Sequence, residues 1–308
     1  MGVVVRTGSR LHFGLFDLNG ERGRCDGGAG VYLEKPGVEV EAEESKRTEV
    51  IAEERVAEIL AAARAFAPHR IIVRRSIPPH VGLGSTTQLL LAVAKACAPH
   101  RRAPELARVV GRGGTSGIGT WGFAKGGLIF DAGHAFPSEK KSFLPSAASR
   151  APPPPLLARI PLPRNWLFVC SVPSPKRIHG KLEKKIFARY CPIPSREVER
   201  AFAAAFSQIA PGALERDISL FGEGIVALQS IGFKKIEWRF QEKATREAFT
   251  LLQKECAGAG LSSFGPLVFG VTDSAKQARG LASFLPNAFV SRVRNKGASI
   301  AHFSSSPA

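Results

Sequence analysis

The stretch GLGSTTQ (residues 82–88) opens an apolar run, LLLAVAKACA, at residues 89–98. A glycine-rich turn that feeds a helix suits phosphate binding, because the first N–H groups of a helix lack partners and carry partial positive charge. Gly82 and Gly84 let an anion approach the backbone closely, and the hydroxyls of Ser85 and Thr86 can bind a phosphate or a metal, or cap the helix. The lysine of a Walker loop is absent, since Thr86 follows Ser85 in its place. The stretch therefore predicts a phosphate cradle of another kind, with a capped helix that holds no ligand as the alternative.

The composition is that of a folded globular protein with a strong positive charge. The 308 residues suffice for one large domain or two ordinary ones, and 44% are hydrophobic. Lysine and arginine outnumber aspartate and glutamate by 43 to 26, which gives a formal net charge of +17. Such a charge attracts nucleic acid, acidic membranes or phosphorylated small molecules. A diffusely basic surface without a partner is the alternative, because the basic residues are scattered.

The cysteines and the N-terminus bear on the compartment. The five cysteines are far apart and form no C-x-x-C pair, so we expect reduced thiols, no disulfide framework and no zinc site. Arg6 and Arg10 interrupt the segment where a signal peptide needs its apolar core. No stretch approaches the roughly 18 apolar residues of a membrane span. We therefore expect a cytoplasmic protein with no membrane partner.

Hydrophobic periodicity alternates strands and helices along the chain. Strands are predicted at 2–6, 31–44, 70–78, 166–173, 266–273 and 288–295. Helices are predicted at 54–66, from the glycine-rich turn to Pro99, from Pro104 to 112, and at 196–209, 213–231 and 243–257. Residues 113–119 read as a glycine loop, residues 123–134 as a hairpin, and the polar tail at 302–308 as frayed.

A proline-dense segment divides the chain. Residues 151–163, APPPPLLARIPLP, cannot be helical and mark a connection between two halves. We predict an N-terminal lobe over residues 1–150 with the glycine-rich loop, a connection at 151–164, and a C-terminal lobe over 165–308. Because strands and helices mix in both halves, the fold class is α+β, with two lobes around a cleft.

The string IPPHVGLGSTTQLLLAVAKA (residues 77–96) resembles the second motif of the GHMP kinase superfamily. The resemblance implies a two-lobed fold with an N-terminal βαβ-type lobe and a C-terminal ferredoxin-like lobe. It also explains the missing Walker lysine, because this superfamily binds phosphates through a backbone cradle.

Three further segments are similar to β-ribofuranosylaminobenzene 5'-phosphate synthases, a family of methanopterin biosynthesis within that superfamily. They are SRLHFGLFDLNGERGRCDGGAGVYLEKP (residues 9–36), GRGGTSGIGTWGFAKGGLIFDAGH (residues 111–134) and HGKLEKKIF (residues 179–187). The resemblance spans nearly the whole chain and is weaker over residues 196–257.

One departure from the superfamily argues against ATP. GLSSFGP (residues 260–266) stands where kinases carry a glycine-rich third motif. Side chains at Ser262, Ser263 and Phe264 would crowd a nucleotide, so no ATP requirement is expected.

The resemblance implies condensation of 5-phosphoribosyl 1-pyrophosphate with 4-aminobenzoate or 4-hydroxybenzoate, with release of pyrophosphate and CO₂. It implies Mg²⁺ as the cofactor and a homodimer as the assembly. The departing pyrophosphate needs cationic and N–H donors, and the ribosyl cation must be shielded from water.

Roles follow residue by residue from this resemblance. Asp17 or Asp26 would bind the metal or face the cation, and Arg24 would neutralise a phosphate or pair with the benzoate carboxylate; we favour the phosphate. These three are the predicted catalytic residues, and Ser85 and Asp17 are the predicted metal ligands. The predicted substrate- and phosphate-binding residues are Arg10, His12, Gly82, Gly84, Ser85, Thr86, Arg112, Gly114, Thr115, Ser116, His179, Ser262 and Ser263.

Two residue-level and two functional alternatives remain open. Asn19 and Gly20 can simply form a hairpin turn, and His179 can be a surface residue. An ATP-dependent GHMP small-molecule kinase is the alternative enzyme. A basic nucleic-acid-binding protein is the alternative from another class, but no RNA-recognition motif or interleaved aromatic pattern supports it, so no nucleic-acid partner is expected.

Overall fold

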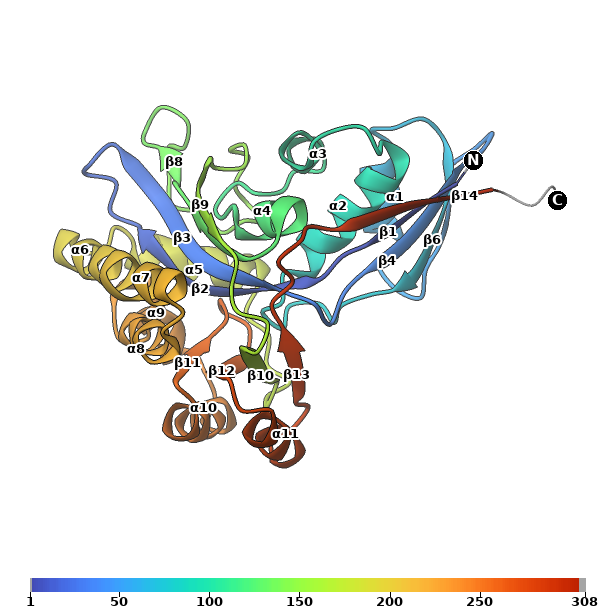
Figure 1. Ribbon diagram of the computed structural model, residues 1–308. Coiled ribbons are helices and arrows are strands. Elements are labelled where there is room, and N and C mark those ends of the chain that lie inside the picture. The colour runs from blue at the N-terminus through green and yellow to red at the C-terminus, as the bar shows by residue number, and fades with distance from the viewer. Residues whose placement is uncertain (1, 305–308) are drawn as a thin grey trace.

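The computed structural model of the chain describes residues 2–304, which form three β-sheets covered by helices (Figure 1). The first sheet has the order β14-β1-β4-β6-β5. Its strands are β1 (Gly2–Arg6), β4 (Glu39–Glu44), β5 (Glu49–Ile51), β6 (His69–Arg75) and β14 (Ser299–Phe303). β5, helix α1 and β6 make a βαβ unit, because β5 and β6 are parallel, whereas the other pairs in this sheet are antiparallel.

The second sheet carries much of the site. It has the order β2-β3-β7-β9, with β8 paired to β3. Its strands are β2 (Ser9–Asp17), β3 (Arg24–Leu33), β7 (Leu128–Asp131), β8 (His134–Ala135) and β9 (Leu156–Ile160).

The third sheet has the order β11-β12-β10-β13 and is antiparallel. Its strands are β10 (Leu167–Ser171), β11 (Gly258–Leu261), β12 (Val268–Thr272) and β13 (Phe289–Arg292). Read from β13, the strands occupy the positions fourth, first, third and second along the chain, which is the ferredoxin-like order. The two-lobed α+β fold and its ferredoxin-like C-terminal lobe are therefore confirmed.

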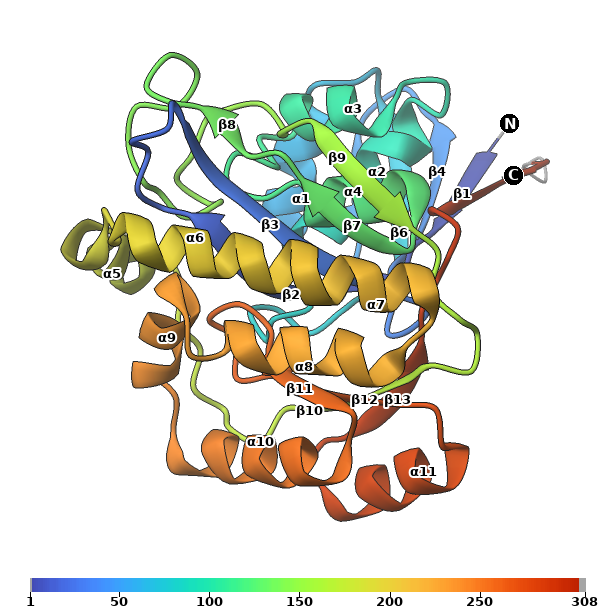
Figure 2. The same cartoon turned by 60° about the vertical axis from the view of Figure 1, so that its left-hand side comes forward.

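The helices pack on these sheets (Figure 2). They are α1 (Val56–Ala63), α2 (Ser85–Cys97), α3 (Ala103–Val109), α4 (Ile118–Lys125), α5 (Gly180–Tyr190), α6 (Ser195–Ala204), the π-helical turn η1 (Ala205–Ile209), α7 (Ala210–Glu215), α8 (Ile218–Leu228), α9 (Gly232–Arg239), α10 (Lys243–Glu255) and α11 (Ala275–Phe284). Within residues 2–304, no helix has the length and apolar character needed to cross a membrane.

Phenylalanine side chains join the second sheet to the third. Phe13 on β2 is fully buried, and its ring centroid lies 6.0 Å from that of Phe221 on α8 and 5.5 Å from that of Phe269 on β12. These contacts bring β2, which contributes to the candidate site, against the C-terminal lobe.

The predicted domain boundaries are crossed twice. The connection at 151–164 contains β9, which pairs with β7, so this segment belongs to the second sheet. The C-terminal strand β14 returns to the first sheet and pairs with β1, as Figure 1 shows near the two termini. The tail prediction is wrong for residues 302 and 303, which lie in β14, and residues 305–308 lie outside the described part of the chain.

Two predicted strand features are wrong. The hairpin at 123–134 does not form, because α4 extends to Lys125 and both β7 and β8 pair with β3. The continuous strand predicted at 31–44 is divided, because β3 ends at Leu33 and β4 begins at Glu39. In the segment between them, Gly37 packs so tightly that a Cβ would lie 2.2 Å from the carbonyl oxygen of Thr7. Helices α5, α9 and α11 were not predicted, and their amphipathic faces pack on tertiary partners.

Replacing Phe13 by alanine is expected to destabilise the protein by about 3–5 kcal/mol, because it empties space between two sheets. The matched control is Leu157→Ala on β9, where the side chain is 53% exposed and the loss should stay within about 0.5 kcal/mol. Urea unfolding of both variants measures the difference, and equal losses would contradict the role of Phe13.

Candidate active site

A cavity of about 500 Å³ lies at the N-terminal end of α2. Its wall comes from β2, the loops before α2 and α4, helices α5 and α9, and residues 263–265. Eleven of the predicted site residues line it: Arg10, His12, Gly82, Gly84, Ser85, Thr86, Arg112, Thr115, Ser116, His179 and Ser263. The structure thus brings together residues as distant in the sequence as Arg10 and Ser263. Their predicted binding roles stay predictions.

The glycine-rich turn has a backbone geometry that favours glycine. The φ angles are 108° at Gly82 and 71° at Gly84, and α2 begins directly afterwards at Ser85. A Cβ on Gly84 would lie 2.9 Å from Cγ of Arg10. Gly84 thus adds no side chain of its own at the start of α2, where the unpaired N–H groups of the first turn and the cation of Arg10 meet, which is the arrangement of an anion site.

Arginines approach the hydroxyls of this first turn. The guanidinium of Arg55 donates to Oγ1 of Thr86 at 2.9 Å, and Nε of Arg112 donates to Oγ1 of Thr87 at 3.2 Å. Ser85 lines the cavity beside them. The hydroxyls of Thr86 and Thr87 thus each accept a hydrogen bond from an arginine.

Two half-buried arginines, Arg10 and Arg112, line the cavity. Burial and, to a smaller extent, the nearby charge of Arg112 lower the pKa of Arg10 to about 10. Burial also lowers the pKa of Arg112. Both guanidiniums remain charged at neutral pH, and a bound anion would relieve their repulsion and offset their lost hydration. This pair provides the strongest electrostatic evidence for a phosphorylated ligand.

His12 and Ser262 join the glycine-rich turn to the C-terminal lobe. Ser262 Oγ accepts from the backbone N–H of His12 at 2.9 Å and donates to the carbonyl oxygen of Gly82 at 2.6 Å. Ser262 is fully buried and does not line the cavity, so its place is structural. Nε2 of His12 lies 3.0 Å from Ser116 Oγ, and burial lowers the pKa of His12 well below its usual range, so this ring is neutral at pH 7.

Asp26 lies in a buried network outside the cavity. Its carboxylate accepts from Nζ of Lys140 at 2.7 Å and faces Nδ1 of His134 at 2.6 Å. Lys140 also donates to Oγ1 of Thr115 at 3.1 Å. The network holds the loop of Thr115 against the segment that carries Lys140, so the geometry supports a positioning role for Asp26 and not the predicted contact with metal or cation.

Asp17 and Arg24 also lie outside the cavity lining. Asp17 Oδ1 accepts from the N–H groups of Asn19 and Gly20 at 2.8 and 3.0 Å, which supports the alternative of a turn at these residues. Arg24 donates to the carbonyl oxygens of Ala132 and Gly133. Both side chains are satisfied by the protein itself, so their predicted catalytic roles, and the metal role of Asp17, find no support in this geometry.

Gly114 is the fifth predicted residue outside the lining. A Cβ there would lie 2.7 Å from Oγ of Ser149, so this glycine permits close packing of two loops.

The cavity also contains residues that sequence reasoning missed. The ring of His80 stacks on that of His179 with centroids 4.1 Å apart, and both side chains are exposed and line the cavity, so the predicted binding role of His179 stays a prediction. Glu58, Glu183 and Glu237 line the wall with Leu15, Ile178, Phe187 and Phe264. Leu15, Glu183, Phe187 and Phe264 lie in segments quoted above for a resemblance or a departure, namely 9–36, 179–187 and 260–266, whereas Glu58, Ile178 and Glu237 lie outside those segments.

Solved structures with the same fold define the class of protein. The chain superimposes on the homoserine kinase of Cytophaga hutchinsonii with a TM-score of 0.65 and 14% identity, over 97% of each chain. It superimposes on the mevalonate kinase of Methanococcus jannaschii with a TM-score of 0.61 and 13% identity, over 95% of this chain and 98% of that one. The fold is that of the GHMP kinase superfamily.

Sequence relatives narrow the class to one family. The chain is 43% identical to a beta-ribofuranosylphenol 5'-phosphate synthase of Methanothermobacter thermautotrophicus, over 88% of this chain and 89% of the relative. It is 39% identical to a synthase of the same name from Archaeoglobus fulgidus, over 96% and 98%. No family model matches the chain. The chain belongs to the beta-ribofuranosylphenol 5'-phosphate synthase family.

Replacing Gly84 by alanine is expected to weaken the binding of inorganic pyrophosphate by about tenfold, because an L-residue in the left-handed region costs roughly 1–2 kcal/mol and its Cβ displaces Arg10. Titration calorimetry measures the affinity. The matched control is Gly280→Ala, where a Cβ would meet nothing within 4 Å; unchanged binding in the Gly84 variant would show that the cradle is misplaced.

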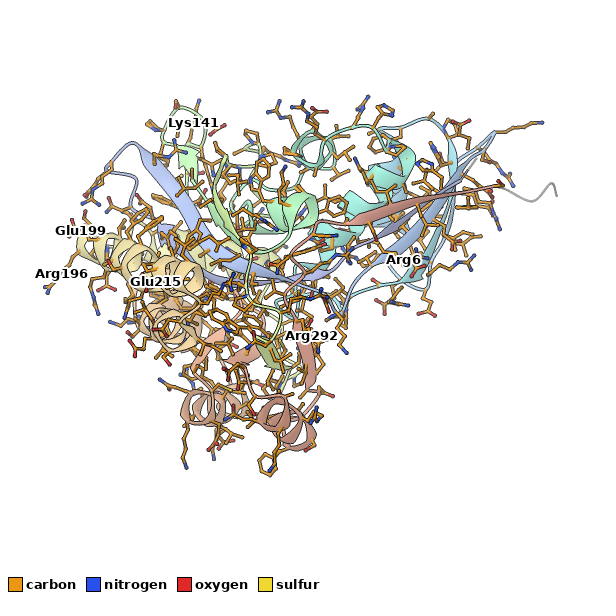
Figure 3. The ribbon with its side chains drawn as sticks, in the orientation of Figure 1. Arg6, Lys141, Arg196, Glu199, Glu215 and Arg292 are labelled. Atoms are coloured by element: carbon orange, nitrogen blue, oxygen red, sulfur yellow. The ribbon has the colours of Figure 1, made fainter. Side chains whose placement is uncertain are left out.

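Replacing Lys140 by methionine is expected to destabilise the protein by about 3–5 kcal/mol, because Asp26 would lose its buried cation. Lys141→Met is the control, since Figure 3 shows this neighbouring side chain at the surface near β8. Thermal and urea unfolding compare the two. Equal stability of both variants would contradict the claim that the Asp26–Lys140 network holds the loop of Thr115 in place.

Proposed function

We propose that the chain condenses 5-phosphoribosyl 1-pyrophosphate with 4-hydroxybenzoate, releasing pyrophosphate and CO₂, in tetrahydromethanopterin biosynthesis. The observation that carries the proposal is the cavity in which the N-terminus of α2 meets the half-buried pair Arg10 and Arg112. Because the chain belongs to a synthase family, we assign the condensation reaction to this anion site. The chain would act as a decarboxylating C-glycoside synthase of the phosphoribosyltransferase type.

The acceptor follows from the chemistry of the product. Relatives carry the name of a ribofuranosylphenol synthase, and a phenol keeps the oxygen of 4-hydroxybenzoate. Attack through the ring carbon that bears the carboxylate forms the C–C bond, and loss of CO₂ from the same carbon restores aromaticity. 4-Aminobenzoate, which the resemblance also allows, is the alternative acceptor.

The residues of the chain would stabilise the leaving group and exclude water. N–H groups of the α2 terminus and the guanidiniums of Arg10 and Arg112 face the position of the diphosphate, whose charge grows as the bond to the anomeric carbon breaks. The apolar side chains of Phe187 and Phe264 on the cavity wall keep water from the ribosyl cation, which would otherwise hydrolyse.

Mg²⁺ is the proposed cofactor. Magnesium is commonly held by few protein ligands together with substrate phosphates, and it would supply Lewis-acid stabilisation of the leaving diphosphate. The donor set fits such a site: the Ser85 hydroxyl lines the cavity, and residues 2–304 contain no cluster of three or more His, Cys, Asp or Glu side chains that could hold a metal alone.

The kinase alternative is not favoured. The relatives that match most of the chain are synthases, and the likeness to homoserine and mevalonate kinases concerns the fold alone. We propose that no ATP is required.

The remaining proposals concern assembly and compartment. The five cysteines are free thiols, which supports a reducing cytoplasm. Exposed apolar side chains on the η1–α7 segment, among them Phe206 and Leu214, support a homodimer.

The direct test is an assay with carboxyl-labelled 4-hydroxybenzoate, the phosphoribosyl donor and Mg²⁺. We expect labelled CO₂ and pyrophosphate in equal amounts, and neither when the donor is omitted. Consumption of ATP without CO₂ release from either benzoate would replace this proposal with the kinase alternative.

Replacing Arg112 by methionine is expected to lower kcat/KM for the phosphoribosyl donor by about 10²–10³-fold, because one preorganised cation at the leaving group is lost. The control is Arg101→Met, at an exposed arginine of the same segment. Steady-state kinetics with the donor varied measures the effect. Wild-type kinetics in a folded Arg112 variant would exclude this residue from the site.

A further inference from the structure

The side of the cavity that adjoins the cationic cradle is an apolar slot containing carboxyl groups. Leu15 on β2, Ile178 and Phe187 by α5, and Phe264 line it and belong to one apolar cluster of the C-terminal side. The ring centroids of Phe187 and Phe264 are 6.5 Å apart at an interplanar angle of 54°. Such a slot suits a flat aromatic ring.

Three carboxyl groups line the cavity, and only one of them is unpaired. Glu58 is 2.7 Å from the guanidinium of Arg55, and Glu237 forms an ion pair with Lys234. Among residues 2–304, Glu183 forms no ion pair within 4 Å and no side-chain hydrogen bond. It extends from α5 one turn before Phe187, so it lies beside the aromatic wall. A carboxyl group left without a protein partner inside a cavity is free to act on a ligand.

The chemistry of a phenol acceptor requires such a group. The ring carbon that bears the carboxylate becomes a strong nucleophile when the para oxygen donates electrons. A neutral hydroxyl donates weakly and would leave a protonated carbonyl after attack, whereas a phenolate donates strongly. A base at the hydroxyl therefore raises the nucleophilicity of the ring at the moment of attack.

We propose that Glu183 is the catalytic base that accepts the phenol proton of 4-hydroxybenzoate while the ring lies in the slot formed by Leu15, Ile178, Phe187 and Phe264. This inference rests on the proposed function and adds to it the residue that activates the acceptor. The acceptor's carboxylate-bearing carbon then points toward the cradle, where the donor's anomeric carbon lies.

The step balances in atoms and electrons. The phenol proton passes to Glu183, the ring carbon bonds to the anomeric carbon, and the C–O bond of the donor breaks with its electron pair leaving on pyrophosphate. The product is a cyclohexadienone that still carries the carboxylate. The bond to CO₂ then breaks, its electron pair restores the aromatic ring as a phenolate, and the phenolate oxygen recovers the proton from Glu183.

The electrostatic environment of Glu183 agrees with this role. Burial and, to a smaller extent, the charge of Glu237 on α9 raise the pKa of its carboxyl to about 7 against the opposing charges of Arg112 and Arg10. The stacked His80 and His179 lie at the same cavity. A base of this strength exchanges a proton with a phenol readily near neutral pH.

The test compares Glu183→Gln with the wild type on two acceptors, 4-hydroxybenzoate and 3,5-difluoro-4-hydroxybenzoate. Fluorine makes the phenol more acidic, so the second acceptor reaches the site already ionised and needs no base. We expect the variant to lose about 10²–10⁴-fold in kcat with the first acceptor and to recover most of that loss, relative to the wild type, with the second. Glu223→Gln, at an exposed glutamate of α8, is the matched control and should change neither rate.

The outcomes separate this inference from the proposed function. If the wild type turns over neither acceptor, the proposed function fails. If the wild type is active and Glu183→Gln loses the same factor with both acceptors, or loses nothing, the assignment of the base fails while the proposed function stands. A folded variant is expected, because Glu183 has no ion pair whose loss would leave a buried charge, and circular dichroism checks this.

Discussion

The carbonyl oxygen of Gly82 is the point at which three distant segments of the chain meet. It accepts from the guanidinium of Arg10 on β2 and from the hydroxyl of Ser262, which in turn accepts from the backbone of His12. There is no room for a side chain at this junction, since a Cβ on Gly82 would lie 2.5 Å from the carbonyl oxygen of Ser262. The cradle, the cation pair and the junction of the two lobes all depend on this close backbone approach.

Ser262 also explains how the superfamily fold can lose its glycine-rich third motif. Its hydroxyl does not crowd the cavity, because it is fully buried and bridges β2 to the loop before α2. The next aromatic residue, Phe264, lines the apolar side of the cavity. In this segment Ser262 therefore links β2 to the loop before α2 by hydrogen bonds, and Phe264 contributes an apolar wall that suits an aromatic ring.

The charges of the molecule act at two levels. The formal charge of +17 is spread over the chain and attracts anions without selecting one. We assign selection to Arg10 and Arg112, the half-buried cations that line the cavity, because a partly desolvated charge interacts with a ligand more strongly than an exposed one. The carboxyl of Glu183 lines the same cavity, near enough to Arg112 and Arg10 for their charges to lower its pKa against the effect of burial.

The fold class, the glycine-rich turn before α2 and eleven of the cavity-lining residues could be predicted from the sequence, because they depend on local signals: glycines before a helix, hydrophobic periodicity and recognisable segments. It assigned Asp17, Arg24 and Asp26 to the site, yet their side chains are satisfied by backbone groups or by Lys140 and His134. Which charged side chains are paired within the protein and which can contact a ligand is visible only in the folded chain, because the pairing partners are distant in the sequence. For the same reason the availability of Glu183, which the sequence shows only as one member of the segment HGKLEKKIF, is visible only once the folded chain leaves it unpaired in the cavity.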